Sequence, residues 1–380
     1  MNLILKLSII LSLVVAVSGC GRNKEAAGTA FNEETRIMMD RMAASVKAGK
    51  ILYGHQDDLV YGHSWCVDPD SAATDALNRS DVKAVAGDYP AVVGFELGGL
   101  ELGWDWSIDK VPFLLMRRAA VEHAGRGGIV TFSWHPHNPY TGGDAWDISS
   151  DKAVTSVLEG GEKAEMFGVW LERLGDFMDS LRDDKGNLIP VIFRPWHENI
   201  GSWFWWGGAL CTADEYIALF RRTVEYLRND RGLDNIIMCY SPNSGITAEQ
   251  YMSRYPGDDV VDILGYDHYE TVMEGESLED AGKRYAGQLD LGLSIVKSLA
   301  SAHGKLMTLS ETGMEGLPDK SWWTSVLYPA VKDFPIVYVL TWRNAWDRET
   351  HFYAPYPGNE GDFREFASLP EISLLSSFRP

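Results

Sequence analysis

Two glutamates carry the residue pattern that chemistry on a glycosidic bond requires. Glu198 and Glu311 each end a short apolar run of the kind that forms a buried strand. Arg194 and His197 stand beside the first of them. Hydrolysis of such a bond uses two carboxyl groups, of which one protonates the leaving oxygen and the other attacks the anomeric carbon or activates water. Two strand ends far apart in the sequence can bring these groups to one ligand.

Tryptophans surround the first glutamate in the sequence. Trp203, Trp205 and Trp206 follow Glu198 within eight residues. Flat apolar rings next to a titratable acid favour a ligand that has both apolar faces and polar edges. Sugars have this character, because their C–H faces lie on indole rings while their hydroxyl groups form hydrogen bonds. The chain holds 14 tryptophans, and we expect about half of them to pack in the core.

The composition limits the class of partner. The 380-residue chain has 45% hydrophobic and 23% charged residues, which is ordinary for a globular protein, and a formal net charge of −20. This charge argues against nucleic acid and an anionic membrane surface as partners, because phosphate groups are bound through basic patches. A neutral polymer substrate is compatible with it.

The N-terminal segment predicts a targeting signal followed by a lipid anchor. Lys6 precedes an apolar stretch that ends at Ser18-Gly19-Cys20, which resembles a bacterial lipoprotein signal. We therefore assign residues 1–19 to a signal peptide, Cys20 to lipidation and residues 20–32 to a flexible tether. The predicted location is the bacterial cell envelope, on the outer membrane, and the sequence leaves open which membrane face carries the protein.

Three further cysteines follow Cys20, and an odd number cannot all pair within the chain. Cys239 lies in an apolar run, which predicts a buried thiol. Cys66 and Cys211 lie in loop-like segments and are able to pair in an oxidising compartment, and the sequence leaves that pairing open. No Cys or His cluster has the spacing of a zinc site, so we predict no metal chemistry and no cofactor.

The alternation of apolar runs and helical patterns predicts an α/β fold. Eight short apolar runs end in polar residues, and apolar spacings of three and four indicate helices over 165–181, 214–227 and 285–299. Eight buried strands fit a (β/α)8 TIM barrel, which we expect to form a single domain over residues 33–378. An open doubly wound sheet is the alternative, but no glycine-rich fingerprint follows the first strand. The runs are Ile51–Gln56, Ala91–Leu97, Ile129–His135, Pro190–Glu198, Asn235–Pro242, Val261–Tyr269, Lys305–Glu311 and Ile336–Asn344.

Several of these strand ends together resemble one known family. The run Arg194–Asn199, with Gly201–Trp206 after it, is similar to the acid/base region of glycoside hydrolase family 26, and Leu309–Gly313 is similar to the nucleophile strand of that family. The resemblance extends over residues 33–378, and endo-β-1,4-mannanases dominate the family. Further matching segments are Tyr53–Gln56, Trp134–Pro136, Tyr266–Tyr269 and Thr341–Asn344.

The resemblance implies a role for each residue around the two glutamates. It implies a retaining mechanism through a covalent glycosyl-enzyme, with the two carboxyl groups about 5–5.5 Å apart. By position, Glu198 is the acid/base and Glu311 the nucleophile. Arg194 and Tyr269 match family positions that hydrogen-bond the nucleophile. His197 is expected to position one of the two carboxyl groups.

The acid role of Glu198 requires a raised pKa, because the group must start protonated. A neighbouring carboxylate and apolar indole walls such as that of Trp203 would raise this pKa. Once Glu311 is glycosylated, its charge is lost and the pKa of Glu198 falls. Glu198 then acts as a base toward water.

Other residues are predicted to bind the sugars. Family position implies that Trp342 is the stacking platform for the ring that is cleaved. Arg343 and His135 are then expected to bind the hydroxyl groups of that ring or of the next one. Asp267 is expected to contact a neighbouring sugar, and Trp146 to stack at a more distant subsite. The predicted substrate-binding set is His135, Trp146, Trp203, Asp267, Trp342 and Arg343.

The leading hypothesis is a monomeric hydrolase of β-mannan polysaccharide or manno-oligosaccharide, galactomannan and glucomannan included, with no cofactor. An enzyme that releases mannobiose from chain ends is the first alternative, and we expect the loops 64–88 and 138–162 to decide between the two. The family also includes β-1,3-1,4-glucanases and β-1,3-xylanases, so these substrates stay open. A catalytically inactive glycan-binding lipoprotein is a different class, and the presence of both glutamates argues against it.

Overall fold

A closed barrel of eight parallel strands forms the centre of the computed structural model, which describes residues 31–68, 76–243 and 247–379. The strands pair in the order β1, β4, β5, β6, β7, β8, β9, β10, and β10 pairs again with β1. This closure confirms the predicted (β/α)8 TIM barrel and rules out the open sheet. The barrel strands are β1 Ile51–Gln56, β4 Val92–Glu96, β5 Ile129–Trp134, β6 Val191–Pro195, β7 Ile236–Tyr240, β8 Ile263–Glu270, β9 Leu306–Met314 and β10 Ile336–Thr341. Three short strands lie outside it: β2 Tyr61–Gly62 and β3 Trp65–Cys66 pair with each other, and β11 Ile372–Ser373 pairs with the start of β1.

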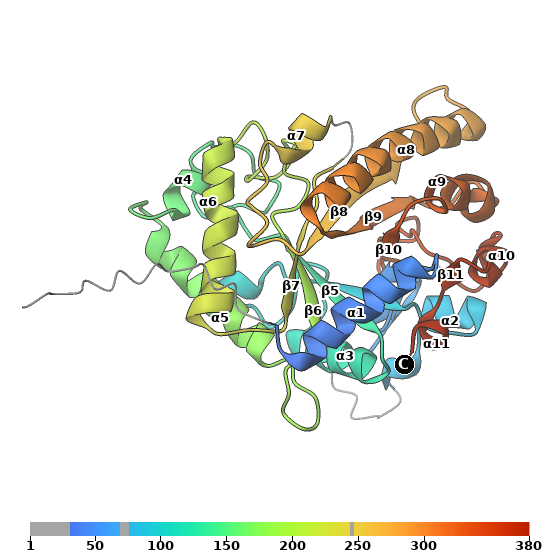
Figure 1. Ribbon diagram of the computed structural model, residues 1–380, viewed down its shortest axis with the longest axis horizontal. Helices are drawn as coiled ribbons and strands as arrows, with labels where there is room; N and C mark the ends of the chain where they lie inside the picture. Colours follow the sequence, from blue (N-terminus) through green and yellow to red (C-terminus); the bar gives the residue numbers. More distant parts are fainter. Residues whose placement is uncertain (1–30, 69–75, 244–246, 380) are drawn as a thin grey trace, which may run out of the picture.

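Helices cover the outside of the barrel, with α5 and α6 on one side and α8 and α9 on the other (Figure 1). The three helices expected from the sequence form, and the capping box of Thr212 and Glu215 begins one of them. The helices are α1 Glu33–Lys47, α2 Asp81–Ala86, α3 Phe113–Gly125, α4 Ala153–Val157, α5 Ala164–Asp179, α6 Ala213–Val224, α7 Ala248–Met252, α8 Leu278–His303, α9 Tyr328–Val331, α10 Phe363–Ser368 and α11 Leu375–Phe378. Short 3-10 segments lie at Ala76–Asn78 and Leu100–Leu102, and π-helical segments at Glu225–Asp230 and Trp323–Leu327.

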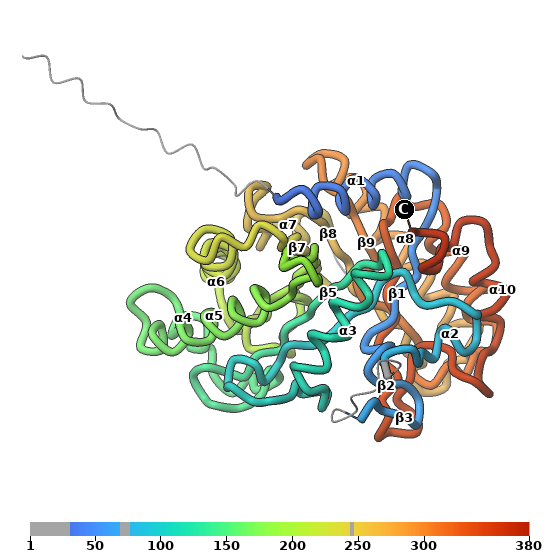
Figure 2. Tube along the Cα trace, turned by 90° about the horizontal axis from the view of Figure 1, so that it is seen from below, coloured from blue at the N-terminus to red at the C-terminus, as the bar shows by residue number. Residues whose placement is uncertain are grey.

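Two layers of apolar side chains build the core. Successive strand residues point in opposite directions, so Ile192 lies in the barrel interior while Phe193 packs under the helices. Helix α1 places Met38 and Met42 against the interior layer, near the start of the strands. Arg41 on α1 also donates a hydrogen bond to the carbonyl of Phe378, so α1 and the C-terminal segment lie together (Figure 2). Because this end is filled, the opposite end is left to bind a ligand.

Eight of the tryptophans are buried, which is close to the expected half. Trp322 and Trp323, which the sequence leaves open between packing and binding, belong to the core. The buried tryptophans are Trp65, Trp134, Trp170, Trp196, Trp205, Trp206, Trp322 and Trp323.

The three cysteines in the described part of the chain form no disulfide. Cys66, Cys211 and Cys239 are free thiols, and Cys239 is buried as predicted.

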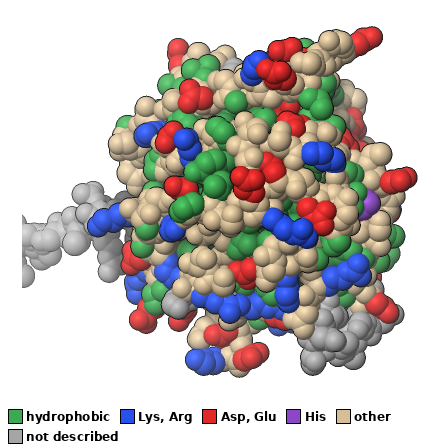
Figure 3. Space-filling view, turned by 90° about the vertical axis from the view of Figure 1, so that its right-hand side faces the viewer, with side chains coloured by type: hydrophobic (Ala, Val, Ile, Leu, Met, Phe, Trp, Pro, Cys, Tyr) green, Lys and Arg blue, Asp and Glu red, His purple; other side chains and the backbone are tan. Residues whose placement is uncertain are grey.

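Acidic and basic side chains are interspersed on the face of the molecule that Figure 3 shows. Within the described ranges, no helix has both the length and the apolarity that crossing a membrane requires. The predicted signal peptide, Cys20 and nearly all of the tether lie outside the described residues.

Candidate active site

One cleft of about 500 Å³ at the C-terminal end of the barrel holds both glutamates. Its walls come from the strands β8 and β9 themselves, from the segments that follow β5, β6, β7, β8 and β10, and from helix α8. Most of the predicted site residues line it, whereas Arg194 and Arg343 are buried beside it. The predicted residues that line the cleft are His135, Trp146, His197, Glu198, Trp203, Asp267, Tyr269, Glu311 and Trp342.

A bulge in β9 turns Glu311 into the cleft. The pairing register between β8 and β9 shifts between Tyr266 and Asp267, so Ser310 is an extra residue on β9. A bulge of this kind lets two successive side chains face the same side of a sheet. Ser310 donates a hydrogen bond of 2.6 Å to Asp267, while Glu311, the next residue, turns to other partners.

Two donors hold the carboxylate of Glu311. Arg194 forms an ion pair with its Oε1 atom, and the Tyr269 hydroxyl donates to Oε2 at 2.7 Å. Arg194 also donates to Asp267 at 2.9 Å and to Ser241 at 3.2 Å. Burial opposes the charge of Arg194, but the carboxylates of Asp267 and Glu311 outweigh it and raise the pKa of the guanidinium. The two partners of Glu311 are thus the two that the sequence predicts, and they suit a carboxylate that must act as an anion.

The strand that carries Glu198 is shorter than predicted. β6 ends at Pro195, whereas the apolar run predicts a strand up to residue 198. The backbone instead turns through Trp196 and Glu198, both in the left-handed region with φ of 55° and 53°. The Glu198 amide donates to the carbonyl of Ser241 at 2.8 Å, which fastens this turn to the segment after β7.

The pKa of Glu198 is raised to about 7, as an acid catalyst requires. Burial is the largest cause, and the nearby Glu311 carboxylate is the second. The prediction for Trp203 is wrong in one respect. Its indole N–H donates a hydrogen bond of 2.7 Å to Glu198, which stabilises the ionised carboxylate and lowers the pKa, whereas an apolar wall would raise it.

Trp203→Phe is therefore expected to raise the pKa of Glu198. Activity requires protonated Glu198, so kcat/KM falls as the pH rises through this pKa, and loss of the donor moves that basic limb to higher pH by about half a unit. Trp203 is 42% exposed, which keeps the shift small. A pH profile of kcat/KM for both proteins measures it. A basic limb that stays in place or moves to lower pH contradicts this reasoning.

Three buried side chains, two of which line the cleft, form a chain of hydrogen bonds. Glu96 accepts hydrogen bonds of 2.7 Å from the backbone N–H and from Nδ1 of His135. Burial opposes charge on both partners, yet the Glu96 carboxylate raises the pKa of His135, and His135 lowers the pKa of Glu96. His197 contacts His135, with 2.9 Å between their Nε2 atoms, and burial lowers the pKa of His197 well below its usual value. His197 thus bonds a histidine where the sequence predicts a carboxyl partner.

The residues predicted to bind sugars differ in their exposure to solvent. Trp146 is 49% exposed and stacks on the His135 ring at 5.3 Å, and Trp342 is partly buried with its ring 6.3 Å from the same imidazole. Asp267 is buried and binds Arg194 and Ser310, so this structure gives it the place of a support for Arg194.

Sequence reasoning predicts Arg343 but misses Asp109, Tyr61 and Tyr353. Arg343 is held by Asp109 at 3.1 Å and by the Tyr61 hydroxyl at 3.2 Å. Tyr353 lines the cleft, with its ring 5.7 Å from that of Tyr269. Asp109 and Tyr353 lie in loops without periodicity and Tyr61 lies in the two-residue strand β2, so no local pattern points to these three residues. The described part of the chain contains no group of three or more His, Cys, Asp or Glu side chains placed to hold a metal ion.

Comparison with known proteins assigns the chain to a family. The family model described as glycosyl hydrolase family 26 matches residues 28–308, a stretch that contains Glu198 and ends just before Glu311. The chain belongs to glycoside hydrolase family 26.

Two solved structures of family 26 resemble this fold throughout the barrel. A β-mannanase from Bacteroides ovatus is 42% identical, with a TM-score of 0.84 over 91% of this chain and 97% of that one. A modular endo-β-1,4-mannanase from Cellulomonas fimi is 32% identical, with a TM-score of 0.78 over 92% of this chain and 77% of that one.

A curated relative gives the same assignment over a longer protein. A mannan endo-1,4-β-mannosidase of Bifidobacterium adolescentis is 30% identical over 364 residues, which is 90% of this chain. The chain spans only 35% of the length of that relative.

Proposed function

We propose that this family 26 protein is a retaining endo-β-1,4-mannanase that acts by double displacement. The observation that carries the proposal is the pairing of two differently supported glutamates in one cleft: Glu311 bound by Arg194 and Tyr269, and Glu198 with its pKa raised to about 7. The names of its relatives support mannan as the substrate.

Each glutamate takes one role in the two steps. Glu311 attacks the anomeric carbon while protonated Glu198 gives its proton to the leaving oxygen, which forms a covalent glycosyl-enzyme. Esterification removes the charge of Glu311, which is the second cause of the raised pKa of Glu198. Glu198 then ionises more readily and takes a proton from the water that releases the sugar.

A time course of products tests the proposal. Galactomannan, glucomannan and barley β-glucan are incubated with the protein, and products are separated by chromatography while viscosity is recorded. An endo-mannanase gives a ladder of manno-oligosaccharides and a fast loss of viscosity. Activity on β-glucan alone overturns the substrate, and the absence of any product overturns the enzymatic function in favour of a glycan-binding protein.

Release of mannobiose from chain ends is the second candidate, and one set of contacts favours it. The loop between β4 and α3 reaches the loop after β10 above the end of β1, since β1 lies between these strands in the barrel. Lys110 forms an ion pair with Asp347 at 2.5 Å and lies over the Trp346 ring at 5.6 Å. We infer that this bridge closes one side of the barrel mouth and that a bound chain would end against it. It lies outside the loops 64–88 and 138–162 to which the sequence points.

The double variant Lys110→Ala, Trp346→Ala is expected to open that side. Longer chains could then extend beyond this side of the cleft, so cleavage would occur farther from their ends. The share of mannobiose among early products should therefore fall by about half, and viscosity should drop several-fold faster per bond cleaved. Stability should change little, since the ion pair is exposed. The product time course measures the change. An unaltered product pattern means that the bridge does not set the mode of cleavage.

The proposed location of the enzyme is the cell envelope. The lipoprotein pattern at Cys20 supports an enzyme held by a lipid anchor at the outer membrane of the cell envelope, acting there as a monomer. Cys20→Ala is expected to release the protein from the membrane fraction without loss of hydrolytic activity.

A further inference from the structure

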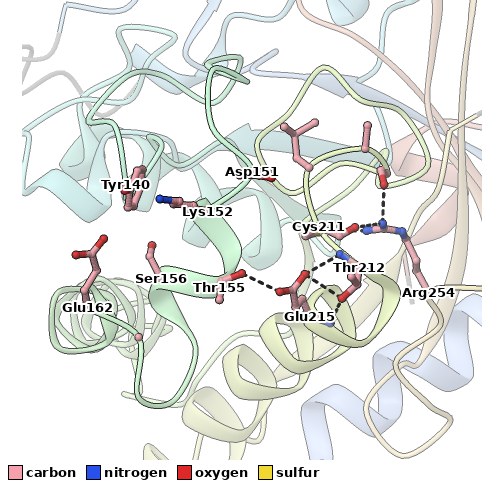
Figure 4. A pocket seen from close by; sticks show the side chains of 14 residues that line it. Tyr140, Asp151, Lys152, Thr155, Ser156, Glu162, Cys211, Thr212, Glu215 and Arg254 are labelled. Carbon is pink, nitrogen blue, oxygen red and sulfur yellow. Dashed lines mark hydrogen bonds between the residues drawn. The ribbon is translucent and has the colours of Figure 1, made fainter.

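A second pocket lies behind the loop that follows β6. Its volume is about 900 Å³, within the range of sites that bind small ligands. No residue that lines the catalytic cleft lines this pocket. Figure 4 shows Tyr140 and Lys152 on one side of it and Cys211 and Arg254 on the other.

Hydrogen bonds inside the walls make the pocket rigid. The buried Asn138 accepts hydrogen bonds from the amides of Tyr140 and Thr141, and its own amide donates to the carbonyl of Asp147 at 2.7 Å. This network fixes the loop that carries Tyr140. Across the pocket, Arg254 is buried and binds the carbonyls of Gly208 and Cys211. A ligand would therefore meet a preformed surface, which lowers the entropy cost of binding.

The charges of the lining argue against an anionic ligand. Asp151, Glu162 and Glu215 bring three acidic groups, against two basic ones from Lys152 and Arg254. The Arg254 guanidinium is already engaged by two backbone carbonyls and the Cys211 sulfur. Phosphates and acidic polysaccharides would thus meet net negative charge. An apolar ligand is equally unsuited, because it would strip water from these charged groups.

A neutral, hydroxyl-rich ligand fits what remains. Tyr140 supplies a partly buried ring, and the Lys152 ammonium group lies 5.6 Å from its centre. The carboxylates of Asp151 and Glu162 and the Lys152 ammonium group line the same pocket and can bond to the hydroxyl groups of a ligand. This combination of an aromatic ring with polar edges is the one that the faces and edges of a sugar require.

We propose that this pocket is a second saccharide-binding site, which holds a segment of the polysaccharide outside the catalytic cleft. The identity of that polysaccharide as mannan rests on the proposed function. The same two loops build both sites: the loop after β5 gives Trp146 to the cleft and Tyr140 to the pocket, and the loop after β6 gives Trp203 to the cleft and Cys211 to the pocket. Trp205 joins these loops, because its amide donates to the carbonyl of Ala145 at 3.2 Å and its indole to that of Pro136 at 2.9 Å. Occupation of the second site keeps the polymer close to the cleft, which raises its effective concentration there.

Tyr140→Ala tests the proposal, and Tyr226→Ala is its matched control. Tyr226 is also partly buried and has Arg222 at the same 5.6 Å from its ring, but it lies on another surface. Tyr140→Ala should raise KM for galactomannan by about three- to tenfold with unchanged kcat. Hydrolysis of the short substrate mannotetraose should stay the same. Tyr226→Ala should match the parent enzyme on both substrates.

A second variant and a direct binding measurement guard against misfolding. Lys152 is exposed, so Lys152→Ala should fold normally and shift KM for the polymer in the same direction. In a Glu311→Ala background, native gels that contain galactomannan should retard the protein less when Tyr140→Ala is added. Equal retardation and equal KM values overturn the second site. If the parent chain cleaves no mannan, the mannanase function fails, and retardation in gels of other neutral polysaccharides still decides whether the pocket binds sugar.

Discussion

Glu311→Ala is expected to reduce kcat on mannan by about 10⁴-fold or more while the protein stays folded. The substitution deletes the atom that forms the covalent bond, so no other contact in the cleft replaces it. In this variant Arg194 keeps Asp267 and Ser241 as hydrogen-bond partners, so its buried charge is still compensated. Release of reducing sugar measures the activity, and thermal unfolding followed by circular dichroism measures the fold.

Glu371→Ala provides the control for this variant. Glu371 accepts a hydrogen bond of 2.8 Å from the Tyr328 hydroxyl, much as Glu311 accepts one from Tyr269, but it lies away from the cleft. It should retain full activity. A 2-fluoro mannoside that traps the glycosyl-enzyme should add its mass to the peptide that contains Glu311. Label on another residue, or near-normal turnover by Glu311→Ala, overturns the nucleophile assignment.

Glu198→Ala is expected to separate two kinds of substrate. Hydrolysis of polysaccharide should fall by about 10³-fold, because the leaving sugar needs a proton. A dinitrophenyl mannobioside has a leaving group that needs none, so formation of its glycosyl-enzyme should stay within about tenfold of the parent rate. Burst kinetics on the aryl substrate and steady-state rates on mannan measure the two effects.

Added azide sharpens the test of Glu198. The anion needs no general base, so it should speed the breakdown of the glycosyl-enzyme in Glu198→Ala and give a mannosyl azide of retained configuration. Glu198→Gln keeps the size of the side chain, and it should show the same loss on polysaccharide and the same acceleration by azide. If either variant loses equal activity on polysaccharide and aryl substrate, the acid/base role is wrongly assigned.

The sequence predicts the barrel well because its signals are local. Each buried strand leaves a short apolar run and each covering helix leaves a spacing of three and four, so all eight strands are found with ends that differ by a few residues. The error that matters for the site is at β6, where Pro195 ends the strand three residues before the predicted end and the backbone then turns at Trp196 and Glu198. Apolar periodicity carries no information on such a turn.

The sequence predicts which residues gather in the cleft and which two bind Glu311, but it does not predict several other contacts between distant residues. The partners of Glu311 follow from strand ends that the barrel brings together. The bond from His197 to His135 depends on ring orientations that no spacing encodes. The bridge from Lys110 to Asp347 joins two aperiodic loops, and the donor role of the Trp203 indole requires its position relative to Glu198. These features arise from tertiary packing and leave no local signal.

The left-handed backbone at Glu198 sets catalysis against stability. A side chain in this conformation costs about 1 kcal/mol that glycine would not incur. Glycine at 198 would relieve the steric strain and end acid catalysis in the same step. Selection for folding alone would therefore favour the loss of this glutamate, and selection for turnover must hold it in place. In a descendant that no longer met the substrate, position 198 is thus expected to lose its glutamate.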